Sequence, residues 1–509
     1  MTTTDARPDT GRGSGLPARD RSVIITLLVA TFVVILNETI MGVALPRLMA
    51  DLEVTARTGQ WLSTAFMLTM AVVIPTTGFL LQRLTTRTVF RLAMGLFCAG
   101  TLLAAVSPGF WLLLPARVVQ ASGTAMMIPL LMTTVLTLVP IERRGVVMGN
   151  ISIAISVAPA IGPTVSGIIL QFLPWRFMFV VVLPIAIAAL VNGSRRLVDI
   201  GEVGHQRLDV ISVLLSVPAF GGIVYGLSQL GSDSTSGGRA AIGFLVVGVI
   251  CLLLFGARQR VLARGRDPLL DLRVFRYPMF SLSVALLCIA MMGLFGMVIL
   301  LPLYLQGIRG IGSLATGLML LPGGLLMGLL GPQVGKIFDR NGPKALTILG
   351  ASLVTLTLWR FSTIDAGTPI WLLVGLHVIM SVGLACLFTP AFTTGLNPLP
   401  PHLYSHGSAV LATLQQVAGA AGTALLIAIM ASRTSTLVAE GVDPAVAQNL
   451  GIQTAFLVAT GIAALAIPCA FFMRNPKPEP AGPPEVGRGS ADHLDVELGP
   501  TQRAVDPQP

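Results

Sequence analysis

Charged residues are scarce in this sequence. Only 11% of its 509 residues are Asp, Glu, Lys or Arg and 54% are hydrophobic, whereas an ordinary soluble domain is about 25% charged. Hydrophobic runs of about 20 residues, the length that a helix needs to cross a bilayer, recur along the whole chain. This excludes an ordinary soluble protein. Helices are expected rather than strands, because a helix satisfies its own backbone hydrogen bonds in lipid and the alternating pattern of a membrane barrel is absent.

Motifs typical of nucleotide-binding proteins, metalloenzymes and hydrolases are missing as well. The sequence contains no GxxxxGK[ST] loop, HExxH, CxxC or nucleophile elbow. Its cysteines all lie in hydrophobic runs and lack the spacing of metal ligands; they are Cys98, Cys251, Cys288, Cys386 and Cys469. We therefore expect no enzyme, no direct use of ATP, no catalytic residue, no metal site and no cofactor.

Fourteen hydrophobic segments are long enough to span a membrane as helices. Their predicted limits are 23–45, 61–82, 88–107, 111–137, 145–169, 174–193, 209–230, 240–257, 280–305, 315–337, 345–361, 369–391, 408–431 and 451–473. The predicted fold class is therefore an all-α membrane protein with 14 transmembrane helices.

The net charge of +10 is concentrated in the loops between these segments. If the amino terminus is cytoplasmic, 25 of the 33 Lys and Arg residues fall in cytoplasmic loops and tails, 7 fall on the opposite side, and Arg117 falls inside a segment. This asymmetry follows the positive-inside rule. It predicts a multi-pass protein of the cell membrane with both termini in the cytoplasm. Because topology already accounts for the charge, nucleic acid is not an expected partner.

Two independent markers indicate a repeated unit. The loop GFLLQRLTTR (78–87) is followed by GKIFDRNGPK (335–344) at an offset of 335 − 78 = 257 residues. The run VALP ends at Pro46 and the run ILLP at Pro302, an offset of 302 − 46 = 256 residues. A parallel repeat of this kind is how a rocking transporter builds a cavity between two halves.

The predicted organisation is six helices, two helices and six helices. Residues 21–193 and 280–474 form two six-helix bundles, and 194–279 holds two extra helices with a basic loop. The polar segments 1–20 and 475–509 are expected to be disordered cytoplasmic tails. No stretch outside the spans can bury a core of its own, which excludes an embedded soluble enzyme.

One carboxylate lies deep within a predicted helix. Glu38 belongs to LNETIMGVALP (36–46), inside the first segment. A charge at a helix centre costs about 2.5–3.5 kcal/mol, so such a residue usually faces a cavity. Because burial favours the neutral acid, Glu38 is a candidate proton carrier. The alternative is a structural hydrogen-bond partner near the outer interface.

A second charge, Arg117, lies early in the fourth segment within LPARVVQASGTA (114–125). A buried guanidinium needs a partner, and the candidates are backbone carbonyls, Gln120 and Glu38. Pairing with Glu38 would link protonation to helix position. The alternative is an interfacial arginine whose side chain reaches the membrane surface.

The fifth segment carries small or polar residues four positions apart, which share one helix face and allow another backbone to approach closely. They are Asn150, Ala154, Ala158, Gly162 and Ser166. Pro159 and Pro163 interrupt the hydrogen-bond ladder nearby and are expected to bend the helix. The pattern indicates either a hinge or seal that sets the direction of coupling, or ordinary close packing.

The two related loops are expected to hold helices together at the cytoplasmic face. Gly335 permits close helix approach, Asp339 is expected to cap the next helix and pair with a basic residue, and Gly342 supports the turn. Gln82 stands where Asp339 stands in the second copy, so the first latch should be weaker. The residues assigned to these conformational motifs are Gly78, Gln82, Arg83, Arg87, Gly335, Asp339, Arg340, Gly342 and Lys344. A solvated basic loop is the alternative.

Polar residues scattered through the segments are candidates for lining a substrate cavity, although most polar residues in helix bundles bond neighbouring helices. They are Asn37, Gln120, Gln306, His377, Gln415 and Gln416.

These motifs resemble those of the major facilitator superfamily, and within it the fourteen-helix drug:proton antiporters. The second loop matches the superfamily signature GxxxDRxGxK in full, and LPARVVQASGTA resembles its fourth-helix motif, with Arg117 as the key basic residue. The run APAIGPTVSG (158–167), which ends at Gly167, is similar to the fifth-helix motif of exporters. Three further runs resemble blocks typical of the fourteen-helix branch: WRFMF (175–179), LPLYLQGIRG (301–310) and LPGGLLMGLLGPQVGKIFDR (321–340). The resemblance covers about residues 20–475 and implies two six-helix bundles plus two extra central helices.

Two positions depart from the family pattern. Where the family commonly has an acid in an LDxT motif, this chain has Asn37, and the acid follows one position later at Glu38. The shift is about 100° around the helix, and the resulting LNET form resembles lincomycin-type exporters. Gln82 replaces the acid of the first loop. The proton role of Glu38 is therefore an inference from position.

The resemblance implies proton-coupled efflux of hydrophobic or amphipathic small molecules by alternating access, with protons, substrate and the lipid bilayer as partners of a monomeric unit. The alternative is a proton-coupled exporter or symporter of one metabolite, lipid precursor or siderophore, although the exporter-like fifth segment argues against import. A non-transporting membrane sensor or scaffold is a third reading, disfavoured by the lack of a sizeable soluble domain.

Overall fold

The computed structural model describes residues 17–197, 199, 209–229, 235–264 and 268–474, and the regular elements assigned in these ranges are all helical. Thirteen of the described helices are long and apolar enough to cross a membrane. The remaining predicted segment, 345–361, is also a helix, α12 (Lys344–Phe361), of 18 residues. The predicted all-α membrane fold is thus confirmed. The predicted tails, apart from residues 17–20, lie outside the described residues.

The helices follow the order six, two, six. The first set is α1 (Ala18–Asp51), α2 (Ala56–Arg83), α3 (Thr86–Ala105), α4 (Phe110–Leu138), α5 (Arg144–Phe172) and α6 (Phe177–Arg196). The middle set is α7 (Val210–Ser216), the π-helical turn η2 (Val217–Gly221), α8 (Gly222–Gln229) and α9 (Thr235–Leu262). The last set is α10 (Pro278–Leu303) with the π-helical turn η4 (Tyr304–Ile308), α11 (Ser313–Asn341), α12, α13 (Ile370–Leu396), α14 (Tyr404–Ala439), α15 (Pro444–Ala464) and α16 (Ala466–Phe472).

Several helices extend beyond their predicted limits. The first segment was predicted at 23–45, but α1 begins at Ala18 and ends at Asp51. Its additional residues include Arg19, Asp20 and Arg21, which are charged. A transmembrane helix can continue into water and headgroups, where hydropathy no longer marks its end. The last residues of the predicted tail are therefore helical.

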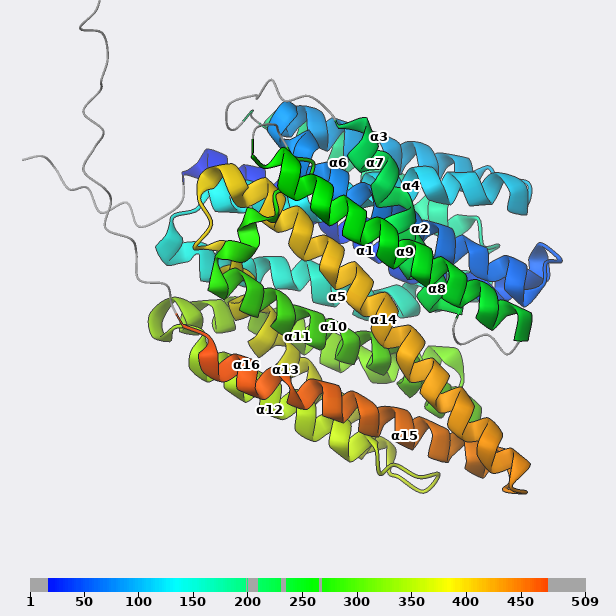
Figure 1. The fold of residues 1–509 in the computed structure, drawn as a ribbon. Helices are drawn as coiled ribbons and strands as arrows, with labels where there is room; N and C mark the ends of the chain where they lie inside the picture. The colour runs from blue at the N-terminus through cyan, green and yellow to red at the C-terminus, as the bar shows by residue number, and fades with distance from the viewer. Residues whose placement is uncertain (1–16, 198, 200–208, 230–234, 265–267, 475–509) are drawn as a thin grey trace, which may run out of the picture. The chain divides into compact units, whose positions relative to one another are not determined.

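The helix contacts repeat between the two halves. In the first half α1 packs on α5, α2 on α4, and α3 on both α4 and α6. In the second half α10 packs on α14, α11 on α13, and α12 on both α13 and α15. Each of these four contacts of the first half is thus matched by one between the corresponding helices of the second. Figure 1 shows α5 and α14 running between the two sets of helices.

Contacts between the halves obey the same symmetry. The second helix of one half packs on the fifth helix of the other, so α11 lies against α5 and α2 lies against α14. The fourth helices follow, with α13 against α5 and α4 against α14. We call the α5–α11 contact the first seam and the α2–α14 contact the second seam. A rocking motion between the halves has to slide or open these two seams.

Part of the first seam brings the two helix backbones into direct contact. A Cβ atom added to Gly145 or Gly149 would lie closer than 3.0 Å to backbone atoms of α11, and one added to Gly331 or Gly335 would come equally close to the backbone of α5. Only glycine permits such an approach. Helices in lipid lack a hydrophobic driving force for association, so small residues stabilise their contacts by allowing close van der Waals packing.

The two extra helices cover one side of the second seam. The element α8 packs on α2, α9 and α14, and the Tyr225 ring stacks on Trp61 of α2 with centroids 5.5 Å apart. The hairpin is closed at one end by an ion pair between Arg258 and Asp209, 2.6 Å apart. The linker is therefore part of the bundle and contacts both halves.

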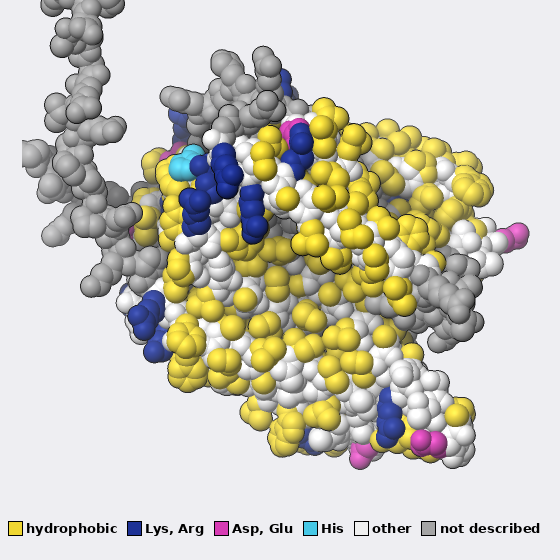
Figure 2. Space-filling model, viewed as in Figure 1, with side chains coloured by type: hydrophobic (Ala, Val, Ile, Leu, Met, Phe, Trp, Pro, Cys, Tyr) yellow, Lys and Arg dark blue, Asp and Glu magenta, His cyan; other side chains and the backbone are white. Residues whose placement is uncertain are grey.

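The outer surface is apolar over most of its length. The span of α9 is only 17% buried, and its exposed residues include Leu253 and Val246. Figure 2 shows this apolar surface, with many of the Lys and Arg side chains of the visible face gathered toward one end. We call the end at which α1 and α5 begin and α2 and α11 end the Arg-rich end. An apolar exposed surface of this extent belongs in a lipid bilayer.

We predict that Gly149→Ala destabilises the protein, because its methyl group would collide with the backbone of α11 at Gly331. Overpacking of this kind costs about 1–3 kcal/mol. The control is Gly375→Ala in α13, where an added Cβ has no heavy atom within 4 Å and the helix gains up to about 1 kcal/mol in propensity. The melting temperature of the purified protein should fall for the first variant and hold or rise for the second. Equal melting temperatures would contradict the close seam.

Candidate functional site

Arg117 is buried in the first half without a carboxylate in contact. It lies on α4, and its side chain is 1% exposed. Its Nη1 donates a hydrogen bond to Oε1 of Gln120 at 2.5 Å, and Nε2 of Gln120 donates to Oγ1 of Thr101 on α3 at 2.8 Å. The guanidinium stands 4.1 Å from the ring centre of Phe66 on α2. Among the candidate partners, Gln120 therefore makes the direct contact.

One side-chain nitrogen of Arg117 lacks a hydrogen bond to any described residue. The Nε atom of Arg117 is buried and has no hydrogen-bond partner among the described residues. A buried cation that is held only by neutral groups is costly. Arg117 lies 117 − 110 = 7 residues from the start of α4, or about 10 Å along the helix axis, and far from the Arg-rich end. A nearby negative charge would lower the cost of burying it.

Glu38 supplies that charge at a distance. It lies in the middle part of α1, is half-buried, and is close enough to Arg117 for the two charges to interact through space. No ion pair within 4.0 Å joins them among the described residues. The next residue, Thr39, contacts α5 at Ala158 and Gly162. The pair is thus separated but coupled, in the interior of the first half.

The other candidate cavity residues are spread over the bundle. Asn37 is 3% exposed, and its Nδ2 has no partner among the described residues. Gln416 lies one turn from Ala412, which packs in a small apolar cluster with Phe66, so Gln416 shares the α14 face that meets α2 and α4. Gln415 lies one turn from Gly419, whose α14 face meets Phe295 of α10.

Two further candidates lie elsewhere in the second half. His377 of α13 places Nε2 3.2 Å from the carbonyl oxygen of Leu320 in α11. Gln306 is exposed and lines a cavity with Gln448 at the end opposite the Arg-rich end. Of the candidate cavity residues, Gln120 alone is hydrogen-bonded to the Arg117 side chain in the described structure.

Asp339 joins the two halves at the Arg-rich end. Its carboxylate oxygens accept hydrogen bonds from the backbone N–H groups of Gly145 at 2.9 Å and Val146 at 3.0 Å, in the first turn of α5. The prediction that Asp339 caps the next helix and pairs with a basic residue is wrong for the described residues, because α5 of the other half presents its free N–H groups to the carboxylate. A negative charge at a helix N-terminus is stabilising.

The first copy of the loop also contacts the other half, but through a neutral side chain that donates hydrogen bonds and does not cap a helix. Nε2 of Gln82, at the end of α2, donates hydrogen bonds to the carbonyl oxygen of His402 at 3.0 Å and to Oγ of Ser405 at 3.1 Å, at the start of α14. A Cβ on Gly78 would lie 3.3 Å from Ala409, which is looser than the first seam. The first latch is therefore neutral and the second charged, and the lower strength of the first stays a prediction.

Arg144 is a central residue that the sequence did not single out. It is 5% exposed and donates to the carbonyl oxygens of Leu136 and Val139 at 2.5 and 3.0 Å. It also crosses to the second half, where it reaches Oδ1 of Asn397, the residue after α13, at 3.1 Å and the hydroxyl of Tyr404 at 3.2 Å. Arg144 begins α5 and Tyr404 begins α14, so corresponding residues of the two halves meet here. In the sequence Arg144 looks like any basic loop residue.

The remaining motif residues have local roles. Arg87 donates from Nε to the carbonyl oxygen of Ser194 at 2.7 Å, which links α3 to the end of α6. Gly342 adopts a φ of 78° after α11, as its position in the turn predicts. Arg340 and Lys344 are exposed.

The predicted small-residue stripe on α5 faces its own half. Gly162 packs against Thr39 of α1, and Oγ of Ser166 lies 3.5 Å from the sulfur of Met178 in α6. The helix continues through Pro159 and Pro163. Contact with the other half is made on a different face of α5, which carries Gly145 and Gly149.

The paired halves, their symmetric seams and the buried charges define a membrane transporter of the two-bundle type. A sequence model of the Major Facilitator Superfamily matches residues 27–423. The chain belongs to this superfamily.

Similar proteins include several that are named for drug resistance. The lincomycin resistance protein LmrB of Bacillus subtilis (strain 168) is 41% identical over 464 residues, which cover 89% of this chain and 96% of that protein. LmrB of Listeria monocytogenes serovar 1/2a is 40% identical over 468 residues, 91% of this chain and 98% of that protein. A multidrug resistance protein B homolog of Mycobacterium tuberculosis (strain CDC 1551 / Oshkosh) is 29% identical over 430 residues, 83% of this chain and 79% of that protein.

A solved structure supports the fold. The crystal structure of the human organic anion transporter MFSD10 (TETRAN) matches with a TM-score of 0.62 at 16% sequence identity, and the match covers 89% of this chain and all of that one. At this identity the likeness establishes the fold alone.

We predict that Gln120→Leu destabilises the protein by about 3 kcal/mol, because it removes the side chain that bonds Arg117 and leaves a buried charge unpartnered. Thermal unfolding of the purified protein measures the effect. The matched control is Gln416→Leu, since the structure shows no hydrogen bond from that side chain to a described residue. Adding Arg117→Met to Gln120→Leu should restore part of the stability. If the double variant is less stable than Gln120→Leu alone, the buried charge is not the cause.

Proposed function

We propose that the protein exports hydrophobic or amphipathic small molecules from the cytoplasm in exchange for protons. The observation that supports this most directly is the separated pair of Glu38 and Arg117 in the interior of the first half. The names of the LmrB relatives, which are 40–41% identical over nearly their full length, support a drug as the class of substrate.

The proposed coupling uses the charge on Glu38. When the carboxyl group is ionised, it attracts the Arg117 guanidinium, which neutral groups alone hold in place. When it takes up a proton, that attraction is lost and the environment favours a different spacing of α1 and α4. Substrate and proton would then compete for the same interior space. Met and Phe side chains around it suit molecules of varied shape.

The energy of one proton is sufficient for useful export. A membrane potential supplies about 2.3 kcal/mol per charge per 100 mV, and one pH unit supplies about 1.4 kcal/mol. Together they sustain a gradient of about 500-fold for a neutral substrate.

The proposed orientation places the Arg-rich end in the cytoplasm, following the positive-inside rule. The Asp339 cap, the Gln82 contact and the Arg144 crossing then hold the cytoplasmic side shut. Opening toward the cytoplasm has to break all three. One chain contains both halves, so the proposed functional unit is a monomer without a cofactor and without enzymatic activity.

We predict that Glu38→Gln abolishes pH-driven efflux while expression persists, because a neutral amide carries no proton. Proteoliposomes loaded with lincomycin or a lipophilic dye measure efflux under an imposed pH gradient and under a substrate gradient alone. Efflux driven by pH should fall at least about 100-fold, whereas downhill exchange should remain. The control Asp51→Asn removes a carboxylate at the end of the same helix. Normal pH-driven efflux by Glu38→Gln would rule out Glu38 as the carrier.

We predict that Asp339→Asn slows turnover about two- to fivefold without changing which substrates are recognised, because a charge at a helix N-terminus is worth about 0.3–1 kcal/mol. Transport rates across a panel of substrates measure both properties. The control Glu142→Gln neutralises an exposed acid near the start of α5 that contacts no seam residue through a hydrogen bond in the described structure. A changed substrate ranking in Asp339→Asn would contradict a purely conformational role.

A further inference from the structure

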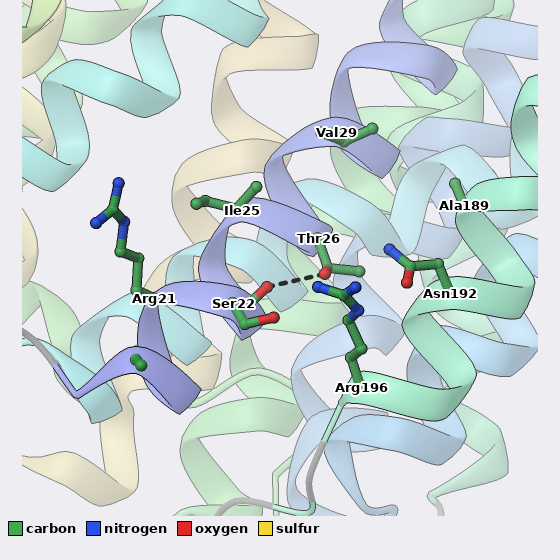
Figure 3. Close-up of a pocket in the computed structure, with 9 residues that line it drawn as sticks. Arg21, Ser22, Ile25, Thr26, Val29, Ala189, Asn192 and Arg196 are labelled. Atoms are coloured by element: carbon green, nitrogen blue, oxygen red, sulfur yellow. Dashed lines mark hydrogen bonds between the residues drawn. The ribbon is translucent and has the colours of Figure 1, made fainter.

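A cavity of about 350 Å³ opens between α1 and α6 at the Arg-rich end. It lies within the first half, between the first turns of one helix and the last turns of the other, and away from both seams. Figure 3 shows its polar side chains, with Arg21 and Arg196 on either side of Ser22 and with Asn192 beside Thr26. None of these residues has a part in the proposed coupling.

The two arginines of this cavity are not engaged by the protein. Arg21 and Arg196 are exposed, and neither side chain forms an ion pair or hydrogen bond with a described residue. Nearby arginines differ, because Arg87 and Arg91 both donate to the carbonyl oxygen of Ser194. The guanidinium N–H groups of Arg21 and Arg196 are therefore available to bind a ligand.

The cavity becomes apolar farther along α1 from its first turn. Ile25 and Val29 line it at one-turn spacing on α1 and are 47% and 48% exposed. Ala189 of α6 lies opposite them and is buried. In a protein that spans a bilayer, the cavity thus presents cations near the membrane surface and an apolar wall toward the membrane interior.

We propose that this cavity binds an anionic phospholipid, with the phosphate on Arg21 and Arg196 and an acyl chain along Ile25 and Val29. The guanidinium group matches phosphate oxygens in pairs, and basic pockets between transmembrane helices suit anionic headgroups. Asn192 and Ser22 add neutral polar groups for a glycerol headgroup. The nearby carboxylates, Asp20 and Asp199, do not line the cavity.

A second cavity offers a comparison, because it also has an apolar wall but has no cationic side chain in its lining. It has a volume of about 510 Å³ and is lined by Val298, Ile299, Pro302, Leu303, Gln306, Gly307 and Gln448, without a charged side chain. It lies at the end opposite the Arg-rich end. The combination of apolar wall and free cations belongs to the α1–α6 cavity, which is the reason to assign it an anionic lipid rather than any lipid.

The test compares two double variants with the same change in net charge. Arg21→Gln with Arg196→Gln removes the lining arginines, and Arg19→Gln with Arg195→Gln removes their exposed neighbours, which do not line the cavity. The full chain in neutral detergent is titrated with phosphatidylglycerol, phosphatidylcholine or soluble glycerol phosphate, and bound lipid is counted by native mass spectrometry.

Phosphatidylglycerol should bind one site of the unaltered protein more tightly than phosphatidylcholine. Its dissociation constant should rise about 30-fold in the lining variant, or about fivefold per arginine, and hold within about threefold in the neighbour variant. If the lining variant is not monodisperse, Arg196→Gln and Arg195→Gln give the same comparison singly.

Three results would overturn the proposal. Equal weakening in both double variants would indicate a general charge effect rather than a site. Equal binding of phosphatidylcholine would show that the cations do not select the headgroup. Binding of glycerol phosphate as tight as that of the lipid would make the cavity a phosphate site in which Ile25 and Val29 have no role.

Discussion

The backbone contact between α5 and α11 is the constraint on which the arrangement of the two halves depends. Helices in lipid gain little from hydrophobic association, so close contact has to come from van der Waals packing and hydrogen bonds. Gly145 and Gly149 meet Gly335 and Gly331 at a distance that excludes any Cβ atom. The same approach brings Asp339 to the free N–H groups of α5. Close packing and the charged cap therefore depend on each other.

The duplicated architecture is symmetric in its contacts but not in their chemistry. The first seam has glycine on both sides and a carboxylate cap, whereas the second has Ala409 opposite Gly78 and hydrogen bonds donated by the neutral amide of Gln82. The extra helices cover the second seam. The two seams therefore occupy symmetric positions but differ in how closely their helices approach. The buried charges, Glu38 and Arg117, belong to the first half and break the symmetry further.

Much of the fold could be predicted from the sequence because bilayer thickness fixes helix length. All fourteen predicted segments are helical, and the offset of 257 residues corresponds to matching helix contacts. The proximity of Arg117 to Gln120 was also within reach, since residues three apart share a helix face. The contacts of Asp339 were predicted wrongly, because the nearest helix in sequence is α12 and the nearest in space is α5. Arg144 was missed because nothing in its sequence context separates a buried arginine from a solvated one.

By itself, the sequence determined that this chain lies in a membrane, that it is built from two copies of one unit, and which few charged residues stand in apolar surroundings. Each of these follows from local hydropathy or from self-similarity, which involve no partner. Only the tertiary structure decided which faces of α5 meet α1 and α11, that Arg117 is held by neutral groups with Glu38 at a distance, and that two arginines remain free beside an apolar groove. Those outcomes depend on which helices become neighbours. Hydropathy does not predict helix neighbours, because every helix in lipid is apolar on most of its surface.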